Sequence, residues 1–156
     1  MNTRFDPDQS AYCKQPFSNK SLSSYYSDDF ERGEPSFFFY DLETSGINPR
    51  EDRIMQFAGQ RTNLDLEPLG DPVNILIKLS EDTLPSPDAT MVTKILPQDT
   101  VARGLSEAEF CKIVTREIFT PNTIVCGYNS VRFDDEYMRY LFWRNFYDPY
   151  EWCWKD

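Results

Sequence analysis

The stretch PSFFFYDLET, residues 35–44, decides the fold. Its apolar and aromatic part, residues 36–40, has the length and composition of a buried central strand. The run stops at Asp41 and Glu43, which point to the same face of a strand, roughly 7 Å apart. Two carboxylates at the mouth of a buried strand are costly unless a cation joins them, and Mg²⁺ or Mn²⁺ prefer such oxygen ligands. The alternative is that both acids are solvated at the end of a strand.

Composition limits the classes of function that this chain can have. The chain has 156 residues, 40% of them hydrophobic and 15% aromatic, which is enough for the packed core of a single domain. Its 16 basic and 26 acidic side chains give a net charge of -10, which argues against binding nucleic acid through a broad basic face. The absence of histidine excludes any mechanism in which this chain supplies a histidine base or metal ligand.

Periodicity and turn residues predict the remaining elements. Beyond the first strand, we expect strands at 54–62, 73–79 and 123–128, a hairpin connection at 65–72, short turns with one helical turn between 83 and 97, a helix from a capping box at 106–109 to about 120, and a helix at 134–145. This order predicts an α/β fold in which helices pack on the faces of a mixed sheet.

The ends of the chain and its cysteines bear on compartment. Residues 1–34 carry four basic and six acidic side chains among polar residues without periodicity, and are predicted to be a mobile leader. The four cysteines are far apart in the sequence and are expected to be free thiols, mostly in the core. No apolar run is long enough for a membrane span, and no secretory signal is recognised, so we expect a cytoplasmic protein without a membrane partner.

A second group of polar residues lies in GYNSVRFDDE, residues 127–136. This segment leaves the last predicted strand and enters the last predicted helix. Its acids, Asp134, Asp135 and Glu136, therefore lie near a helix N-terminus, where the helix dipole favours carboxylates in any case. Considered alone, the segment is explained by ordinary enrichment of acids in a first helical turn.

Together the two segments resemble a known superfamily. A strand-end D-x-E, followed about 90 residues later by an Asn and an Asp at a strand-to-helix junction, resembles the DEDD superfamily of 3′-to-5′ exonucleases. Asn129 lies five residues before Asp134, a spacing similar to that of the bacterial exodeoxyribonuclease I family. The segments FYDLETSG, RIMQFAGQRTN and ILPQDTVARG, and the stretch 127–150, are similar to the same family. The resemblance covers about residues 37–154.

The resemblance implies a ribonuclease H-like fold and a two-metal hydrolysis of single-stranded DNA to mononucleotides. Asp41 would bridge two Mg²⁺ or Mn²⁺ ions, Glu43 would bind one of them and Asp134 the other. By the same resemblance, a single-strand-binding protein would be a further partner.

The resemblance also implies substrate contacts. Thr44 and the backbone near it would touch the terminal nucleotide, and Asn129 and Phe133 would shape its pocket. Phe133 has an equal alternative, which is packing at the entry to the helix. Arg132 would contact a phosphate, although a single exposed arginine is weak support for this role.

The chain departs from the superfamily pattern after Asp134. The superfamily has a fourth acid, an aspartate, that follows either a His by five residues or a Tyr by four. After Asp134 the chain has no His, and four residues after its tyrosines at 137, 140, 147 and 150 stand Leu141, Arg144, Glu151 and Trp154, so neither pattern with an aspartate occurs. Asp135, Glu136 and Asp148 are poor substitutes, because the first two diverge around the helix and the third lies past its end. We therefore expect residues 35–156 to form an incomplete exonuclease domain, without its last strand and helix, that is inactive unless part of a longer protein.

A competing hypothesis is a non-catalytic binding module, in which a degenerate exonuclease fold is kept for contacts with a partner or DNA. The aromatic tail at 147–154 would then be its interaction surface.

Overall fold

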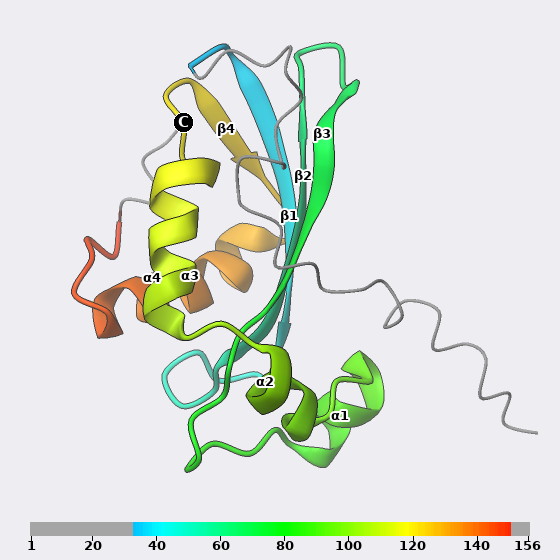
Figure 1. Ribbon diagram of the computed structural model, residues 1–156, viewed down its shortest axis with the longest axis vertical. Coiled ribbons are helices and arrows are strands. Elements are labelled where there is room, and N and C mark those ends of the chain that lie inside the picture. Colours follow the sequence, from blue (N-terminus) through cyan, green and yellow to red (C-terminus); the bar gives the residue numbers. More distant parts are fainter. Residues whose placement is uncertain (1–32, 151–156) are drawn as a thin grey trace, which may run out of the picture.

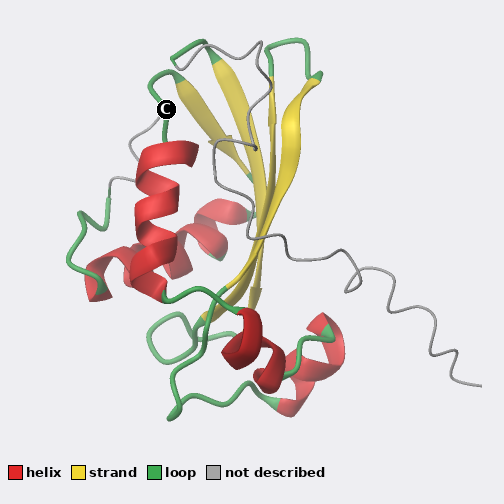
Figure 2. Ribbon diagram, viewed as in Figure 1, coloured by secondary structure: helices red, strands yellow, loops and turns green. Residues whose placement is uncertain are grey.

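The computed structural model describes residues 33–150, which form a four-stranded sheet with helices against it (Figures 1 and 2). The strand order is β3-β2-β1-β4. Pairing is antiparallel between β1 and β2 and between β2 and β3, and parallel between β1 and β4. The strands are β1 (Ser36–Thr44), β2 (Ile54–Thr62), β3 (Pro68–Leu76) and β4 (Thr123–Cys126). The predicted mixed sheet is confirmed, whereas all but the last two residues of the predicted leader lie outside the described residues.

Helices lie on one face of the sheet and at one of its ends. They are α1 (Pro87–Thr93), α2 (Pro97–Arg103), α3 (Glu107–Ile113) with a π-helical turn (Val114–Ile118), a short 3₁₀ turn (Ser130–Arg132) and α4 (Asp134–Arg144). α3 and α4 cover one face, while α1 and α2 lie near one end of the sheet (Figure 1). The predicted capping box of Ser106 and Glu109 starts α3. None of the helices described here is both long and apolar enough to cross a membrane.

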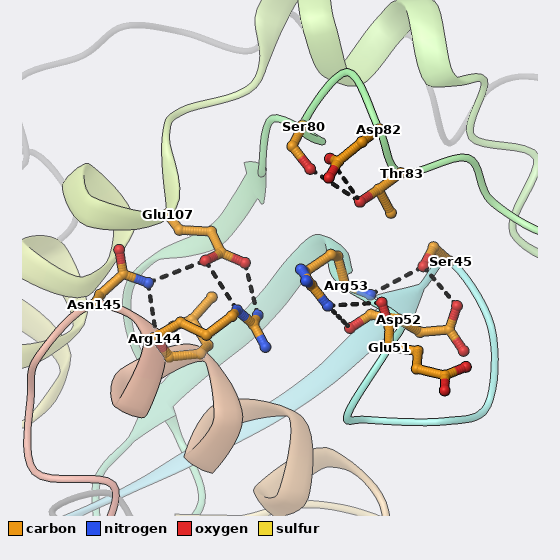
Figure 3. A network of polar contacts seen from close by, with 11 residues as sticks. Ser45, Glu51, Asp52, Arg53, Ser80, Asp82, Thr83, Glu107, Arg144 and Asn145 are labelled. Carbon is orange, nitrogen blue, oxygen red and sulfur yellow. Dashed lines mark hydrogen bonds and ion pairs between the residues drawn. The ribbon is translucent and has the colours of Figure 1, made fainter.

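The core lies between β1, β2 and β3 on one side and α3 and α4 on the other. Alternate residues of β1, namely Phe38, Tyr40 and Leu42, are buried in it. Full burial of each such side chain contributes roughly 1.5–3 kcal/mol, so this alternation fixes which face of β1 receives the helices. At the outer edge, Glu107 at the start of α3 forms an ion pair with Arg144 of α4 at 2.7 Å (Figure 3).

A buried arginine joins three strands at the end of the sheet where β1 begins. Arg61 of β2 is 4% exposed and donates hydrogen bonds to the hydroxyls of Ser36 in β1 and Thr123 in β4. Its other terminal nitrogen donates to the carbonyl of Ile118, and its guanidinium lies over the ring of Phe38. Because these contacts satisfy the buried charge, they fix the position of β4 beside the first half of β1.

Several predicted boundaries were wrong, each for a physical reason. β1 continues to Thr44, because β2 pairs with it beyond the apolar run, so the two acids lie inside the strand. β3 begins at Pro68 within the predicted hairpin connection, because it is an edge strand of the described sheet, where proline is tolerated. β4 stops at Cys126, two residues early. α2 was not predicted, because Pro97 was interpreted as a turn residue, although it occupies the first turn of that helix.

The edge formed by β4 generates a prediction about association. Among the described strands β4 pairs only with β1, and its Ile124 side chain is 42% exposed. Such an apolar edge pairs with other chains. We expect the protein to self-associate at tens of micromolar, and Ile124→Lys to weaken association about ten-fold.

Sedimentation velocity measures this effect. The matched control is Val92→Lys, which places the same charge on a 79% exposed residue of α1, away from the β4 edge. A wild-type protein that stays monomeric, or a Val92→Lys variant that dissociates as much as Ile124→Lys, would contradict the prediction.

Candidate active site

The site arises where β4 ends and β1 continues. The last pair of the parallel ladder is Phe39 with Cys126, and β1 extends five residues further, to Thr44. The chain then turns back at Gly127. A Cβ atom there would lie 2.7 Å from Cβ of Ser130 and 3.1 Å from the carbonyl oxygen of Tyr40. Only glycine fits so close an approach. The turn therefore brings the start of α4 against the uncovered edge of β1.

Asp134, the first residue of α4, lies beside the two acids of β1. Asp134 is 4% exposed, and the backbone of Leu42, which stands between Asp41 and Glu43, is near enough to act on its carboxylate. Burial raises the pKa of Asp134 to about 6, and the charge of Asp41 adds to the rise. Backbone hydrogen bonds act in the opposite direction without cancelling it.

Glu43 shares this environment. Its pKa is raised first by burial and then by the charges of Asp41 and Asp134. Opposite these residues on β2 stand Ala58 and Gln56, which are neutral. Within residues 33–150, no Lys or Arg is among the groups that lower the pKa of Asp134 or Glu43. The structure thus brings three predicted acids together without a protein cation to balance them.

The donor set fits a hard divalent cation. Carboxylate oxygens are the ligands that Mg²⁺ and Mn²⁺ prefer, and the repulsion between the acids is the kind that a bound cation relieves. Within residues 33–150, however, no three acidic or cysteine side chains are close enough together in this conformation to hold a metal ion. Asp41 is solvent-exposed whereas Asp134 is buried.

The residues predicted to contact substrate lie near these acids, and they differ in their exposure and in their contacts. Asn129 and Arg132 are exposed on the turn before α4, and Asn129 has a left-handed backbone with φ of 56°. Phe133 is half-buried, packs against the core and lies 5.0 Å from the ring of Tyr137, so helix-entry packing is one of its roles. The buried hydroxyl of Thr44 donates to the carbonyl of Gly46 at 2.7 Å, so its backbone is better placed than its hydroxyl to meet a ligand.

The loop after Thr44 is held by residues that the sequence interpretation missed. Asp52 accepts hydrogen bonds from the hydroxyl of Ser45 at 3.0 Å and from the amide of Asn48 at 2.9 Å. The same serine hydroxyl accepts from the amide of Arg53, as Figure 3 shows. A Cβ atom at Gly46 would lie 2.3 Å from the Asp52 carboxylate, so the network requires glycine there. Gly46 and the dipeptide Asn48-Pro49 are the sequence signals that could have indicated this turn.

The other two acids of the first turn of α4 face different partners. Asp135 accepts a hydrogen bond from the hydroxyl of Tyr40 at 2.5 Å, and Glu136 pairs with Arg139 at 2.6 Å. The expectation that these two diverge from Asp134 around the helix agrees with this arrangement. The contact between Tyr40 and Asp135 was not predicted, because it joins residues 95 positions apart.

Comparisons with known proteins agree with this architecture. Exodeoxyribonuclease I of Haemophilus influenzae is 50% identical over 121 residues, which are 78% of this chain and 26% of that protein. A crystal structure of Escherichia coli Exonuclease I in complex with a dA16 oligonucleotide matches with a TM-score of 0.75 and 43% identity, over 78% of this chain and 26% of that one. An ExoI/SSB-Ct complex matches with the same TM-score and identity, over 78% of this chain and 27% of that one.

These matches bear on the fold and on the length of the chain. The solved structures confirm the predicted fold class, a mixed sheet with flanking helices. The chain spans about a quarter of the length of the curated relatives it matches. A protein-family model described as Exonuclease matches residues 38–155, three quarters of the chain and all of the site described above. The chain therefore belongs to the exonuclease family, and its similarity to Exodeoxyribonuclease I supports a nuclease function.

Proposed function

We propose that this chain contributes the metal-binding part of a 3′-to-5′ exonuclease that hydrolyses single-stranded DNA to mononucleotides. The observation that carries the proposal is the meeting of Asp41, Glu43 and Asp134 without a balancing basic side chain. A chain of net charge -10 needs a cation between itself and a polyanion, and a metal site of carboxylates supplies one.

The three acids would have separate roles. Asp41 would bridge two ions in the complete enzyme, Glu43 would hold one and Asp134 the other. Bound Mg²⁺ or Mn²⁺ polarises the scissile phosphate, lowers the pKa of the attacking water and stabilises the leaving 3′ oxygen. Burial of Asp134 would keep its carboxylate fixed, while the exposed Asp41 would be open to a substrate.

Substrate would be held by the turn before α4. Arg132 is exposed and would pair with a phosphate, and Asn129 would donate to the terminal nucleotide. Phe133 would contact a base with the part of its ring that the core leaves uncovered. The backbone after Thr44 would complete the pocket. The Escherichia coli structure that contains an oligonucleotide and the ExoI/SSB-Ct complex support single-stranded DNA and a single-strand-binding protein as partners.

Activity tests the proposal directly. Three acids hold a divalent ion loosely, and neither the His nor the Tyr pattern for the fourth superfamily aspartate occurs after Asp134. General-base catalysis alone is worth about 10²- to 10⁴-fold, so we expect essentially no hydrolysis of single-stranded DNA by the 156-residue chain. A fusion at its C-terminus to the corresponding downstream region of the Haemophilus influenzae relative should release mononucleotides from the 3′ end with Mg²⁺.

Asp41→Ala in the fusion should abolish turnover, and Asp99→Ala is a matched control because that aspartate lies on α2 and pairs with Arg103. Mg²⁺-dependent hydrolysis by the short chain that Asp41→Ala does not change would place the chemistry elsewhere. A folded, metal-binding fusion that binds single-stranded DNA without cutting it would favour the non-catalytic binding module.

The raised pKa of Asp134 predicts how stability depends on pH. The pKa is about 6 in the folded chain against an ordinary value of 3.8, so the folded state holds the proton more tightly. In EDTA, the wild type should therefore lose stability relative to Asp134→Asn as pH rises from about 4 to about 6, by about 2 kcal/mol. At pH 7, Mg²⁺ should raise the Tm of the wild type and leave that of Asp134→Asn nearly unchanged.

Thermal unfolding followed by circular dichroism gives both results. Asp148→Asn serves as the control, because that aspartate is exposed and lies beyond the end of α4. Equal pH dependence in wild type and Asp134→Asn would mean that the three acids do not repel one another in the folded protein.

A further inference from the structure

We infer that Tyr40 is a positioning residue for the proposed metal site: its hydroxyl holds Asp135 and thereby keeps Asp134 against Asp41. The inference rests on the proposed metal role of the three acids. It adds a residue that would bind neither metal nor substrate, and would act through the placement of helix α4.

The contact links the two halves of the site through their immediate neighbours. Tyr40 directly precedes Asp41 on β1, and Asp135 directly follows Asp134 on α4. The phenol oxygen of Tyr40 lies 2.5 Å from Oδ1 of Asp135, in the range of a hydrogen bond to an ionised acceptor. One hydrogen bond therefore joins the two segments that carry the acids, although they are 95 residues apart in sequence.

The phenol itself is rigidly placed. Tyr40 is 5% exposed and its ring stacks on that of Phe57 in β2, with 5.8 Å between the ring centroids. Its side chain is on the core face of β1, whereas Asp41 is on the other face. The hydroxyl is thus held by the core, and it fixes the helix without occupying the space where a ligand would bind.

The start of α4 needs such a contact. Phe133 at the N-cap gives no side-chain hydrogen bond to the helix, and β4 ends before it can pair with this part of β1. The charges of Asp41 and Asp134 repel, which favours separation of α4 from the strand. Contacts that oppose that separation include the Tyr40 hydroxyl on Asp135 and the Tyr137 hydroxyl, which donates to the carbonyl of Gly46 just beyond β1 at 2.8 Å.

Partners that orient metal ligands typically change metal affinity by 10- to 100-fold when they are removed. We therefore expect Tyr40→Phe, which keeps the ring and its stacking, to weaken Mn²⁺ binding by about ten-fold or more while changing Tm little. The measurement is free Mn²⁺ by electron paramagnetic resonance during titration of the full 156-residue chain. Tyr140→Phe is the matched control, because it removes a tyrosine hydroxyl on α4, the helix of Asp135, and the partner of that hydroxyl is Arg50. Its affinity should equal that of the wild type.

Substitutions at Asp135 approach the same hydrogen bond from the helix. Asp135→Asn and Asp135→Ala both remove the charge, but only asparagine keeps an oxygen that accepts from Tyr40. We expect Asp135→Asn to bind Mn²⁺ several-fold more tightly than Asp135→Ala. In the Asp135→Ala background, Tyr40→Phe should have no further effect, because the hydrogen bond is already absent. These variants keep the test decisive even where Tyr40→Phe alone does not fold.

The outcomes separate this inference from the proposed function. A wild type that binds no Mn²⁺, or binds it as Asp41→Asn does, overturns the metal site and the inference with it. A wild type that binds Mn²⁺, loses it with Asp41→Asn and keeps it with Tyr40→Phe overturns the role of Tyr40 alone. Equal loss on Tyr40→Phe with and without Asp135 also overturns it, because the hydroxyl would then act through another group.

Discussion

The site depends on the unequal lengths of two parallel strands. β4 pairs with residues 36–39 of β1 and stops, while β1 continues to Thr44 with β2 along its other edge. Arg61 fixes this offset from the far end by holding β1 and β4 together where both begin. Beyond β4 the uncovered part of β1 meets the first turn of α4, where the backbone of Leu42 acts on the carboxylate of Asp134.

The unfavourable electrostatic free energy of the folded chain is concentrated where the first turn of α4 meets β1. A folded chain buries one carboxyl group and brings two more beside it only if packing elsewhere is strong enough to offset the repulsion. The core beneath α4 supplies this, since Tyr137, Met138 and Leu141 are all fully or almost fully buried against the sheet. The helix is therefore held by its apolar face, while its first residue remains in an unfavourable charged environment that a cation would relieve.

Local sequence patterns were sufficient to predict the features of the fold and site that depend on short-range geometry. Strand alternation placed Asp41 and Glu43 on one face, and the capping box located the start of α3. Joining Asp134 to them required the family resemblance, because its acidic neighbours have an ordinary explanation in the helix dipole.

Sequence patterns failed to predict the features that depend on contacts between distant segments of the chain. Pro68 lies in β3 because that strand forms an edge of the described sheet, and Pro97 begins a helix instead of a turn. The contact of Tyr40 with Asp135 and the network around Asp52 join residues through the fold, so periodicity contains no sign of them. The roles of the site residues in metal and substrate binding are predictions, and the fold is physically consistent with them.

The most direct test of the metal site is paramagnetic broadening of amide signals in the ¹⁵N-labelled chain by substoichiometric Mn²⁺. Because the proposed ion lies between the two segments, the signals of Leu42 and Asp134 should disappear first and together, before those of other acidic segments such as the first turns of α1 and α2. Earlier broadening at Asp88 or Asp99, or uniform broadening along the chain, would contradict a metal site formed by β1 and α4.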